Sequence, residues 1–354
     1  MDKLTAQPHN VSFSTPTHGV PLIAVEGSAF DCGREYVEIV LSRYPGYHRY
    51  LNMLDAWRRL PRHVEALFDQ RAPYIPEVYR GMLAAYSPAT GVYAPQAEQP
   101  ATEEECTSFG LGGTFTADGL PLSGQNKDTV RHSESLYIVL RMRITGAPTI
   151  LVLAYPGEVL GYGLWSTGMT LFRNSLHSTA DHPVGLTKEQ FGLLALAGRT
   201  VDEATELAMR EGVQDQCNIL LSDSLGGSIN VETNGGGVDV LPAANGLCVH
   251  ANHPVGTKTI HHEQRENQDK ARNSRLREQR LTNLLREARG KLTSKECFRI
   301  LSDHENYPYG LCSHDENDSG ETCTTASVVA EPARGLLHVV RSNPCRSRPV
   351  SYSI

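Results

Sequence analysis

The sequence lacks the motifs that mark several common enzyme classes. It contains no G-x-S-x-G nucleophile turn and no G-x-x-x-x-G-K phosphate-binding loop. The glycine-rich segment Gly110-Leu111-Gly112-Gly113 has neither the preceding strand nor the following helix that a dinucleotide-binding turn requires. These absences argue against a serine hydrolase of that type, a P-loop enzyme and a dinucleotide-dependent enzyme.

An excess of positive charge and long hydrophobic runs are absent too. With 33 Lys and Arg against 40 Asp and Glu, the formal net charge is −7, which provides no electrostatic footprint for nucleic acid. No segment approaches a continuous membrane-spanning run, and residues 1–8 lack the charged start and apolar run of a secretory signal. The cysteines include no C-x-x-C pair. We therefore expect a cytoplasmic protein with reduced thiols and no membrane or nucleic-acid partner.

Cys106 is the most informative residue that is present. It follows residues 87–105, a stretch with three prolines, few apolar residues and an acidic end at Glu105, which predicts an exposed connector. Apolar residues separated by glycines follow Cys106 and predict a hairpin that enters a sheet. A thiolate at this junction could attack the carbonyl of Glu105. The new α-amine of Cys106, with a pKa of about 8, could then serve as the base for its own thiol.

Five motifs together resemble the acyl-coenzyme A:6-aminopenicillanic acid acyltransferase family of self-processing N-terminal-nucleophile hydrolases. The resemblance runs from about Gly27 to about Arg341. In chain order the motifs are Cys106-Thr107-Ser108, Gly124-Gln125-Asn126-x-Asp128, Asn174-Ser175-Leu176-His177, His250-Ala251-Asn252-His253 and Asn306-Tyr307-Pro308.

The resemblance implies a role for each matching position. Cys106 would be the nucleophile and, after cleavage, its amine the base. Asp128 would orient that amine, Asn252 would donate its side-chain amide to the oxyanion, and Asn174 would provide a second polar contact. Cleavage between Glu105 and Cys106 would give an α-chain, 1–105, and a β-chain, 106–354, that stay associated.

The expected reaction is acyl transfer through a thioester, with water or an amine as the acceptor. The substrate would be a small amide or an acyl donor such as acyl-coenzyme A, with no cofactor. His177, His250 and Arg275 are the predicted substrate-binding residues. In the basic stretch 270–280, either Arg275 or Arg277 could contact an anionic substrate, or the stretch could be an ordinary solvated helix face. The chain departs from the family pattern at Glu105, where glycine is frequent, and at Gly320–Thr325, which lacks the arginine of the penicillin-making prototype. We therefore expect a different substrate.

Each candidate also has an ordinary structural alternative. Asp128 could be a turn residue, and Asn252 could end a strand before Pro254. His250 and His253 lack a third ligand at recognisable spacing, so no metal site is expected. The other cysteines are interpreted as small buried hydrophobic residues: Cys32, Cys217, Cys248, Cys297, Cys312, Cys323 and Cys345.

Two competing functions remain open at this point. The first is an ordinary cysteine hydrolase that pairs Cys106 with His250 or His177 and needs no chain cleavage. The second is a non-catalytic binding protein on the same fold.

The periodicity of apolar residues predicts a mixed α+β chain in one domain. Helices are expected at 32–41, 51–60, 62–70 and 77–85, after the capping residues Thr187, Thr200 and Thr293, and over the basic stretch 270–280. Strands are expected at 109–116, 136–144, 149–155, 169–174, 219–223, 228–232, 238–241, 247–251, 325–330 and 336–340. The family resemblance implies that these elements form a four-layer αββα sandwich.

Overall fold

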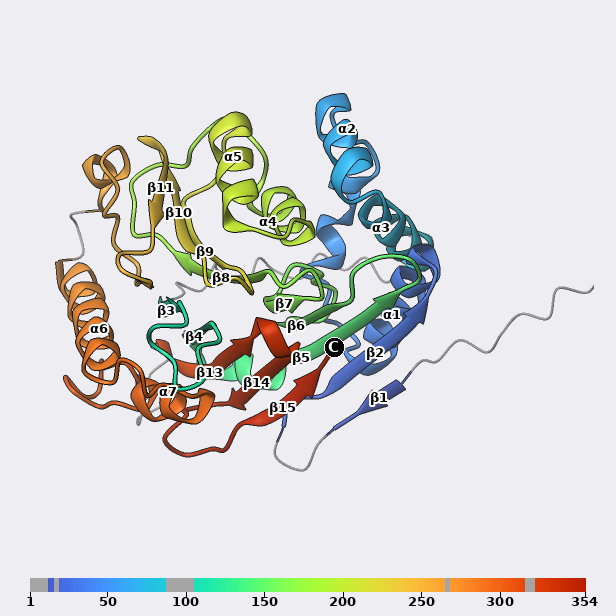
Figure 1. The fold of residues 1–354 in the computed structure, drawn as a ribbon. Coiled ribbons are helices and arrows are strands. Elements are labelled where there is room, and N and C mark those ends of the chain that lie inside the picture. The colour runs from blue at the N-terminus through green and yellow to red at the C-terminus, as the bar shows by residue number, and fades with distance from the viewer. Residues whose placement is uncertain (1–11, 16–18, 87–104, 265–267, 316–321) are drawn as a thin grey trace, which may run out of the picture.

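The computed structural model describes residues 12–15, 19–86, 105–264, 268–315 and 322–354. Over these residues the strands form two sheets, one of nine strands and one of six (Figure 1). No helix of the described chain is both long enough and apolar enough to cross a membrane. The predicted connector lies outside the described residues except for Glu105.

The nine-stranded sheet is antiparallel apart from one parallel pair between β2 and β5. Its strands, in spatial order, are β1 (Ser12–Ser14), β2 (Leu22–Gly27), β5 (Ile138–Ile144), β6 (Ile150–Ala154), β7 (Tyr162–Trp165), β8 (Thr170–Ser175), β9 (Cys217–Ser222), β10 (Ser228–Asn234) and β11 (Gly237–Pro242). Its outer face carries α1 (Ala29–Arg43), η1 (Leu51–Trp57), α2 (Arg62–Arg71), α3 (Tyr74–Ala85), α4 (Lys188–Ala197) and α5 (Val201–Glu211).

The six-stranded sheet is antiparallel throughout. Its strands, in spatial order, are β12 (Leu247–His250), β3 (Glu105–Leu111), β4 (Leu122–Val130), β13 (Thr322–Glu331), β14 (Leu336–Arg341) and β15 (Val350–Ser353). Its outer face carries α6 (Gln268–Glu287) and α7 (Ser294–Leu301). Short 3₁₀ turns, η3 (Arg131–Ser135), η4 (Thr259–His262) and η5 (Pro332–Arg334), join the elements.

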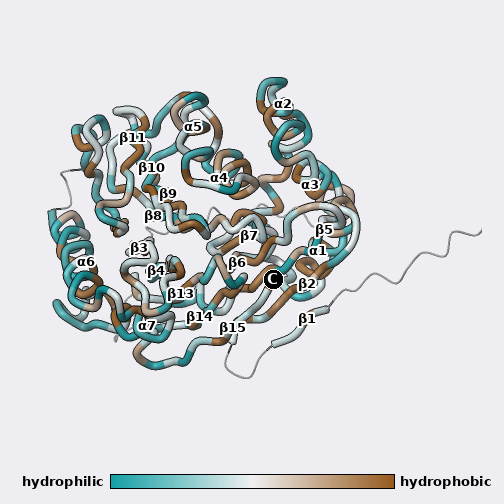
Figure 2. Tube along the Cα trace, in the orientation of Figure 1, coloured by the Kyte–Doolittle hydropathy of each residue, from teal (hydrophilic) through white to brown (hydrophobic). Residues whose placement is uncertain are grey.

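Three hydrophobic clusters hold these layers together. The first lies between the outer helices and the large sheet, with Phe68 and Leu140 among its members. The second lies between the two sheets, where Phe172 and Val328 are buried. The third packs Leu281 of α6 against the small sheet. The hydrophilic outer side of α6 is evident in Figure 2. The order is helix, sheet, sheet, helix, which confirms the expected αββα sandwich.

Helices α1 and α3 approach each other unusually closely. A Cβ atom placed on Gly33 would lie 2.0 Å from the carbonyl oxygen of Val78, and one on Gly81 would lie 1.9 Å from that of Phe30. Backbone atoms cannot move aside as a side-chain end can. The two helices therefore fit together only because both contact positions are glycine.

Most predicted elements are present, with two differences around the nucleophile. The strand expected at 109–116 starts at Glu105 and ends at Leu111, so Cys106 lies inside a strand and Glu105 is buried. Strand β4 was not predicted, because residues 123–129 are polar or glycine throughout and yet buried. The three capping threonines each accept a backbone N–H at a helix start, as predicted.

Candidate active site

Cys106 is completely buried near the start of β3. β3 pairs with β12 on one side and β4 on the other, and Cys106 lies opposite Lys127 of β4. One residue earlier, Glu105 lies opposite Asp128. The bond between Glu105 and Cys106 is therefore held in the small sheet next to the predicted carboxylate.

Asn252 contacts the backbone of the nucleophile. Its Oδ1 accepts a hydrogen bond from the Cys106 backbone N–H at 3.0 Å, and its Nδ2 donates to the carbonyl of Ser175 at 2.8 Å. Its own backbone N–H donates to Ser274 Oγ at 2.7 Å. In the intact chain Asn252 thus presents its side-chain oxygen to the backbone of the nucleophile. The donation of its amide to an oxyanion stays a prediction.

Arg277 is the central cation of the site, and sequence reasoning named it only alongside Arg275. It lies on α6 with 2% of its surface exposed. Nη1 donates to the carbonyl of Cys106 at 2.9 Å and to Thr107 Oγ1. Nη2 donates to Asn252 Oδ1 at 2.8 Å and to Glu105 Oε2 at 3.3 Å. A planar guanidinium can hold several acceptors in this way.

The helical spacing of α6 could have indicated that Arg277 faces inward. The buried residues of α6 recur at helical spacing and include Ala271, Ser274, Arg277, Leu281 and Leu285. Arg277 falls within this inward stripe, whereas Arg275 does not. An arginine in an apolar stripe is unusual enough to mark a buried ion pair.

Glu105 and Asp128 bring two carboxylates together beside that arginine. Asp128 has 1% of its surface exposed, and its Oδ1 accepts a hydrogen bond from Thr324 Oγ1 at 2.7 Å. Its Oδ2 has no hydrogen-bond partner among the described residues. Burial raises the pKa of Asp128 to about 7, and Glu105 adds to the rise while Arg277 opposes it.

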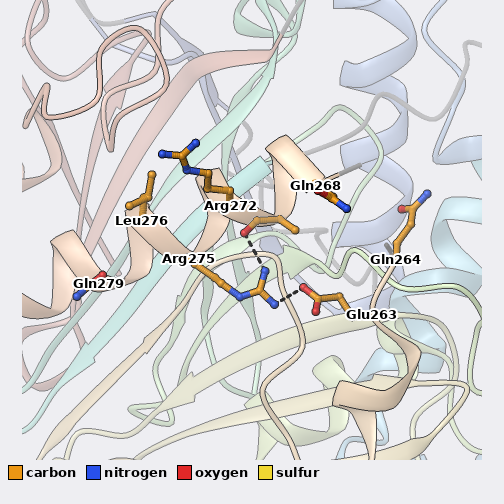
Figure 3. Close-up of a pocket in the computed structure, with 8 residues that line it drawn as sticks. Glu263, Gln264, Gln268, Arg272, Arg275, Leu276 and Gln279 are labelled. Atoms are coloured by element: carbon orange, nitrogen blue, oxygen red, sulfur yellow. Dashed lines mark hydrogen bonds and ion pairs between the residues drawn. The ribbon is translucent and has the colours of Figure 1, made fainter. Parts of the chain in front are cut away.

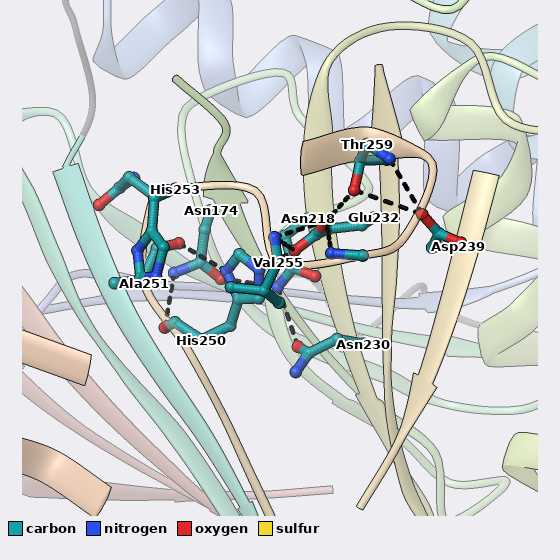
Figure 4. Close-up of polar contacts among 12 residues, drawn as sticks. Asn174, Asn218, Asn230, Glu232, Asp239, His250, Ala251, His253, Val255 and Thr259 are labelled. Carbon is teal, nitrogen blue, oxygen red and sulfur yellow. Dashed lines mark hydrogen bonds and ion pairs between the residues drawn. The ribbon is translucent and has the colours of Figure 1, made fainter. Parts of the chain in front are cut away.

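Asn174 lies in a buried amide network next to the nucleophile strand. Its Oδ1 accepts a hydrogen bond from Ser108 Oγ at 2.7 Å and a longer one from Asn218 Nδ2 at 3.3 Å. Its Nδ2 faces the carbonyl of His250 at 3.4 Å (Figure 4). Ser108 is two residues from Cys106 on the same face of β3. Asn174 thus lies on the face of β3 that also carries the Cys106 side chain.

Both ring nitrogens of His250 are hydrogen-bonded. Nε2 lies 2.6 Å from Glu232 Oε1 and Nδ1 lies 2.8 Å from the carbonyl of Ala251 (Figure 4). Burial lowers the pKa of His250, but the bond and charge of Glu232 outweigh burial and the net pKa is raised. In this conformation no ring atom of His250 is available to a substrate. β12 ends at His250, one residue before the expected end of this strand, so Asn252 lies in the segment that follows it.

His177 lies at the border of the site. Its backbone N–H donates to the carbonyl of Asn252 at 2.6 Å. Its Nδ1 is buried without a hydrogen-bond partner among the described residues. Burial lowers the pKa of His177, with the charge of Arg277 acting in the same direction. A neutral imidazole here can accept or donate a hydrogen bond.

Arg275 points away from this group. Its guanidinium pairs with Glu263 and donates to the carbonyl of Ala271 at 3.2 Å (Figure 3). These residues line a surface cavity of about 380 Å³ together with Gln264, Gln268, Arg272, Leu276 and Gln279. The structure therefore brings Cys106, Asp128, Asn252 and Arg277 together and places Arg275 elsewhere.

The family model for acyl-coenzyme A:6-aminopenicillanic acid acyl-transferase matches residues 115–345, which is more than half of the 354 residues. The chain belongs to this family. It is accordingly related to enzymes that transfer acyl groups. The matched span includes Asp128, Asn174, Asn252 and Arg277 and begins after Cys106.

Solved structures similar to this family member include a mutant of conjugated bile acid hydrolase from Clostridium perfringens. The sequence identity is 14%, with 70% of this chain and 97% of that chain covered and a TM-score of 0.47. Penicillin V acylase from Agrobacterium tumefaciens is 12% identical, with 72% and 78% of the two chains covered and a TM-score of 0.35.

Proposed function

We propose that this chain is a self-processing cysteine amidohydrolase or acyltransferase that cuts its own backbone between Glu105 and Cys106. The Cys106 sulfur attacks the carbonyl carbon of Glu105, the carbon–nitrogen bond breaks, and the nitrogen takes a proton to become the α-amine of Cys106. Water then hydrolyses the thioester, which releases the Glu105 carboxylate and regenerates the thiol.

The observation that carries this proposal is a pair of side-chain hydrogen bonds to the backbone N–H and the carbonyl of Cys106. Asn252 Oδ1 holds its nitrogen and Arg277 Nη1 holds its carbonyl oxygen, each through a hydrogen bond of 3.0 Å or less. Any buried backbone N–H and C=O needs a partner, but at Cys106 polar side chains supply these contacts. A nitrogen that is to become a catalytic amine does need a fixed acceptor.

Burial of Cys106 supports the same proposal. The residue has no exposed surface in the intact chain, so an external substrate cannot reach its sulfur. Breaking the bond after Glu105 would free the end of the α-chain to move and would open one side of the nucleophile. Cleavage would therefore create both the base and the access that turnover requires.

In the cleaved enzyme the same residues would act on an external acyl group. The α-amine, held by Asn252 Oδ1, would take the proton from the thiol and return it to the leaving group. Asp128 would balance the charge of the amine, and Arg277 would hold the Cys106 carbonyl. Asn252, through Nδ2, and Asn174 remain the candidate oxyanion donors.

The substrate class that we propose is a small amide or an activated acyl donor. Water as acceptor gives an amidohydrolase, and an amine gives an acyltransferase. His177 borders the site and would contact the substrate. A substrate role for Arg275 would require a ligand that reaches the surface cavity beside Glu263.

Intact-mass analysis of the purified protein tests the cleavage. We expect two chains, 1–105 and 106–354, and a single chain for Cys106→Ala. The matched control is Cys248→Ala, which removes a buried cysteine from the adjacent strand β12 and should cleave normally. An uncut wild-type chain that turns over an amide would contradict the proposal.

Nδ1 of His177 is buried and has no hydrogen-bond partner in the described part of the chain. This favours one second candidate, a cysteine hydrolase that uses this histidine and needs no cleavage. His177→Ala separates the two. In the self-processing enzyme this variant still yields the two chains. In the cysteine–histidine enzyme the wild type is uncut and His177→Ala loses all turnover.

A further inference from the structure

A second cluster of reactive side chains lies away from Cys106, where two loops meet. His304 follows α7, and Cys312 and His314 lie further along the same connection toward β13. Cys345 comes from the loop between β14 and β15. The middle two are buried, and His304 and Cys345 are exposed.

The four ligand atoms lie close together. The Nε2 atoms of His304 and His314 are 3.1 Å apart, and the sulfurs of Cys312 and Cys345 are 3.6 Å apart. His314 Nε2 lies 3.4 Å from Cys312 Sγ and 3.6 Å from Cys345 Sγ. All four atoms lie within 4.8 Å of one another.

Four of the six separations, from 3.1 to 3.6 Å, lie close to those of a zinc site. Bond lengths of about 2.3 Å to sulfur and about 2.0–2.1 Å to nitrogen place tetrahedral corners roughly 3.3–3.8 Å apart. Two thiolates and two imidazoles are also a donor set that zinc prefers in structural sites. Ordinary side-chain packing rarely directs four such atoms at a single point.

We propose that His304, Cys312, His314 and Cys345 bind a zinc ion in a closed tetrahedral site. With four protein ligands, no coordination position remains for water, so the ion would be structural. The site would fasten the connection between α7 and β13 to the loop after β14. This role is independent of whether the chain cleaves itself.

The surroundings are suited to a metal-bound thiolate. Asn343 Nδ2 donates to Cys312 Sγ at 3.5 Å and to the carbonyl of Ser313 at 2.7 Å. The Cys312 backbone N–H donates to the carbonyl of Asp303 at 3.1 Å. Hydrogen bonds of this kind orient ligands and stabilise the charge on sulfur.

The proposed zinc loop also contacts the strands that carry the active site. The backbone N–H of Ser313, which lies between two ligands, donates to Thr324 Oγ1 at 2.9 Å. Thr324 Oγ1 in turn donates to Asp128 Oδ1 at 2.7 Å. The carbonyl of Leu311 accepts from Asn126 Nδ2 at 2.8 Å. The ion would thus hold in place the loop that supports Asp128.

Metal analysis and cobalt substitution test the site on the full-length protein. We expect stoichiometric zinc in protein purified without chelator, and tetrahedral d–d bands with a thiolate-to-cobalt charge-transfer band after Co²⁺ replacement. Cys345→Ser and His304→Ala remove exposed ligands, so both variants should fold. Second-sphere changes alone cost about 10- to 100-fold in metal affinity, so losing a ligand should weaken Zn²⁺ binding by more than about 100-fold.

His132→Ala is the matched control, since it removes an exposed histidine on η3 and should leave zinc content unchanged. Two results would overturn the proposal. One is protein without zinc that also fails to take up added Zn²⁺ or Co²⁺. The other is a Cys312–Cys345 disulfide, detected as a mass 2 Da below that of the reduced chain, in protein prepared under reducing conditions.

Discussion

The pairing of Glu105 with Asp128 gives the intact chain an electrostatic feature that the cleaved chain would lose. Two carboxylates face each other across β3 and β4, and Arg277 balances only part of their charge. Cleavage would free Glu105 to leave with the α-chain. The pKa of Asp128 should then fall, so that it can carry a negative charge beside the new amine.

Asp128 should make the stability of the uncut chain depend on pH. Its pKa rises from 3.8 to about 7 on folding, so between these values the folded chain holds a proton that the unfolded chain has lost. The free energy of unfolding must therefore fall as the pH rises through this window. For Cys106→Ala, we expect a loss of about 2–4 kcal/mol from this group between about pH 4 and about pH 8.

Denaturant unfolding of Cys106→Ala with and without Asp128→Asn measures this effect. The asparagine variant should be the more stable of the two near neutral pH and should lack this part of the pH dependence. Equal pH profiles for the two proteins would show that Asp128 keeps an ordinary pKa.

Two arginines on one turn of α6 should differ in their importance for cleavage. Arg277→Ala removes four hydrogen bonds at the nucleophile and should slow chain cleavage by about 100-fold, because small displacements of reacting groups cost that much. Arg277→Lys should be intermediate, since lysine cannot hold the same acceptors together. Arg275→Ala should cleave at the wild-type rate, because that residue pairs with Glu263.

Timed intact-mass measurements after expression give these rates, and circular dichroism confirms folding. Arg277→Lys that folds and cleaves like the wild type would contradict the assigned role of Arg277.

For the candidate site, the sequence predicted which residues come together better than it predicted their contacts. Cys106, Asp128 and Asn252 are far apart in the chain and were nonetheless expected to act together, and the structure places all three around one peptide unit. Arg277 was not separated from Arg275, because a basic stretch conceals which side chain faces inward. The orientation of the Asn252 amide depends on Arg277 and the Cys106 N–H, neither of which sequence periodicity can place.

The segment after β12 positions Asn252, and a buried carboxylate holds this segment in place. Glu232 on β10 accepts hydrogen bonds from His250 Nε2 at 2.6 Å, from the backbone N–H groups of Val255 and Gly256 at 2.9 Å each, and from Thr259 Oγ1. Figure 4 shows His250, Val255 and Thr259 around Glu232. Asn252 lies between His250 and Val255, which both contact Glu232, so its placement depends on Glu232.

Glu232→Ala should therefore be strongly destabilising. Removing one member of a buried ion pair costs about 3–5 kcal/mol, and here backbone donors also lose their acceptor. The free energy of unfolding measures the loss, and hydrogen exchange should increase over residues 251–259. Glu77→Ala removes a surface carboxylate paired with Arg80 and should cost less than about 1 kcal/mol. Similar losses for the two variants would contradict this role of Glu232.

The unpredicted strand β4 shows a limit of hydropathy patterns. Strand signals rely on apolar residues, yet Ser123, Gln125, Asn126, Lys127 and Asp128 are all buried. Their partners are supplied by other segments, as when Asn126 Nδ2 donates to the carbonyls of Leu301 and Leu311. A strand that carries an active site can be polar for this reason, and only the tertiary structure reveals it.

The two expected chains share one hydrophobic core. Residues before the cut supply β2, which pairs with β5, and the helices α1, α2 and α3, which cover the large sheet. Each large side chain that is fully buried, such as Phe68 or Met82, contributes about 1.5–3 kcal/mol. Many such residues lie before Cys106. The free energy of this burial should therefore far exceed the conformational entropy that the two chains gain when one peptide bond is cut.

After cleavage, the chains 1–105 and 106–354 should elute together in native gel filtration and separate only in denaturant. Native mass spectrometry gives the same information directly. Release of the shorter chain under native conditions would show that it is a removable pro-segment and not part of the folded enzyme.

The glycine contact between α1 and α3 has a consequence for the large sheet. Only Ser28 separates the end of β2 from the start of α1. An outward shift of α1 would therefore also move the end of β2. An alanine at Gly33 or Gly81 would have to tilt a helix, because the obstructing atoms are carbonyl oxygens. The absence of side chains at Gly33 and Gly81 thus helps to align β2 with β5, the single parallel strand pair among the described residues.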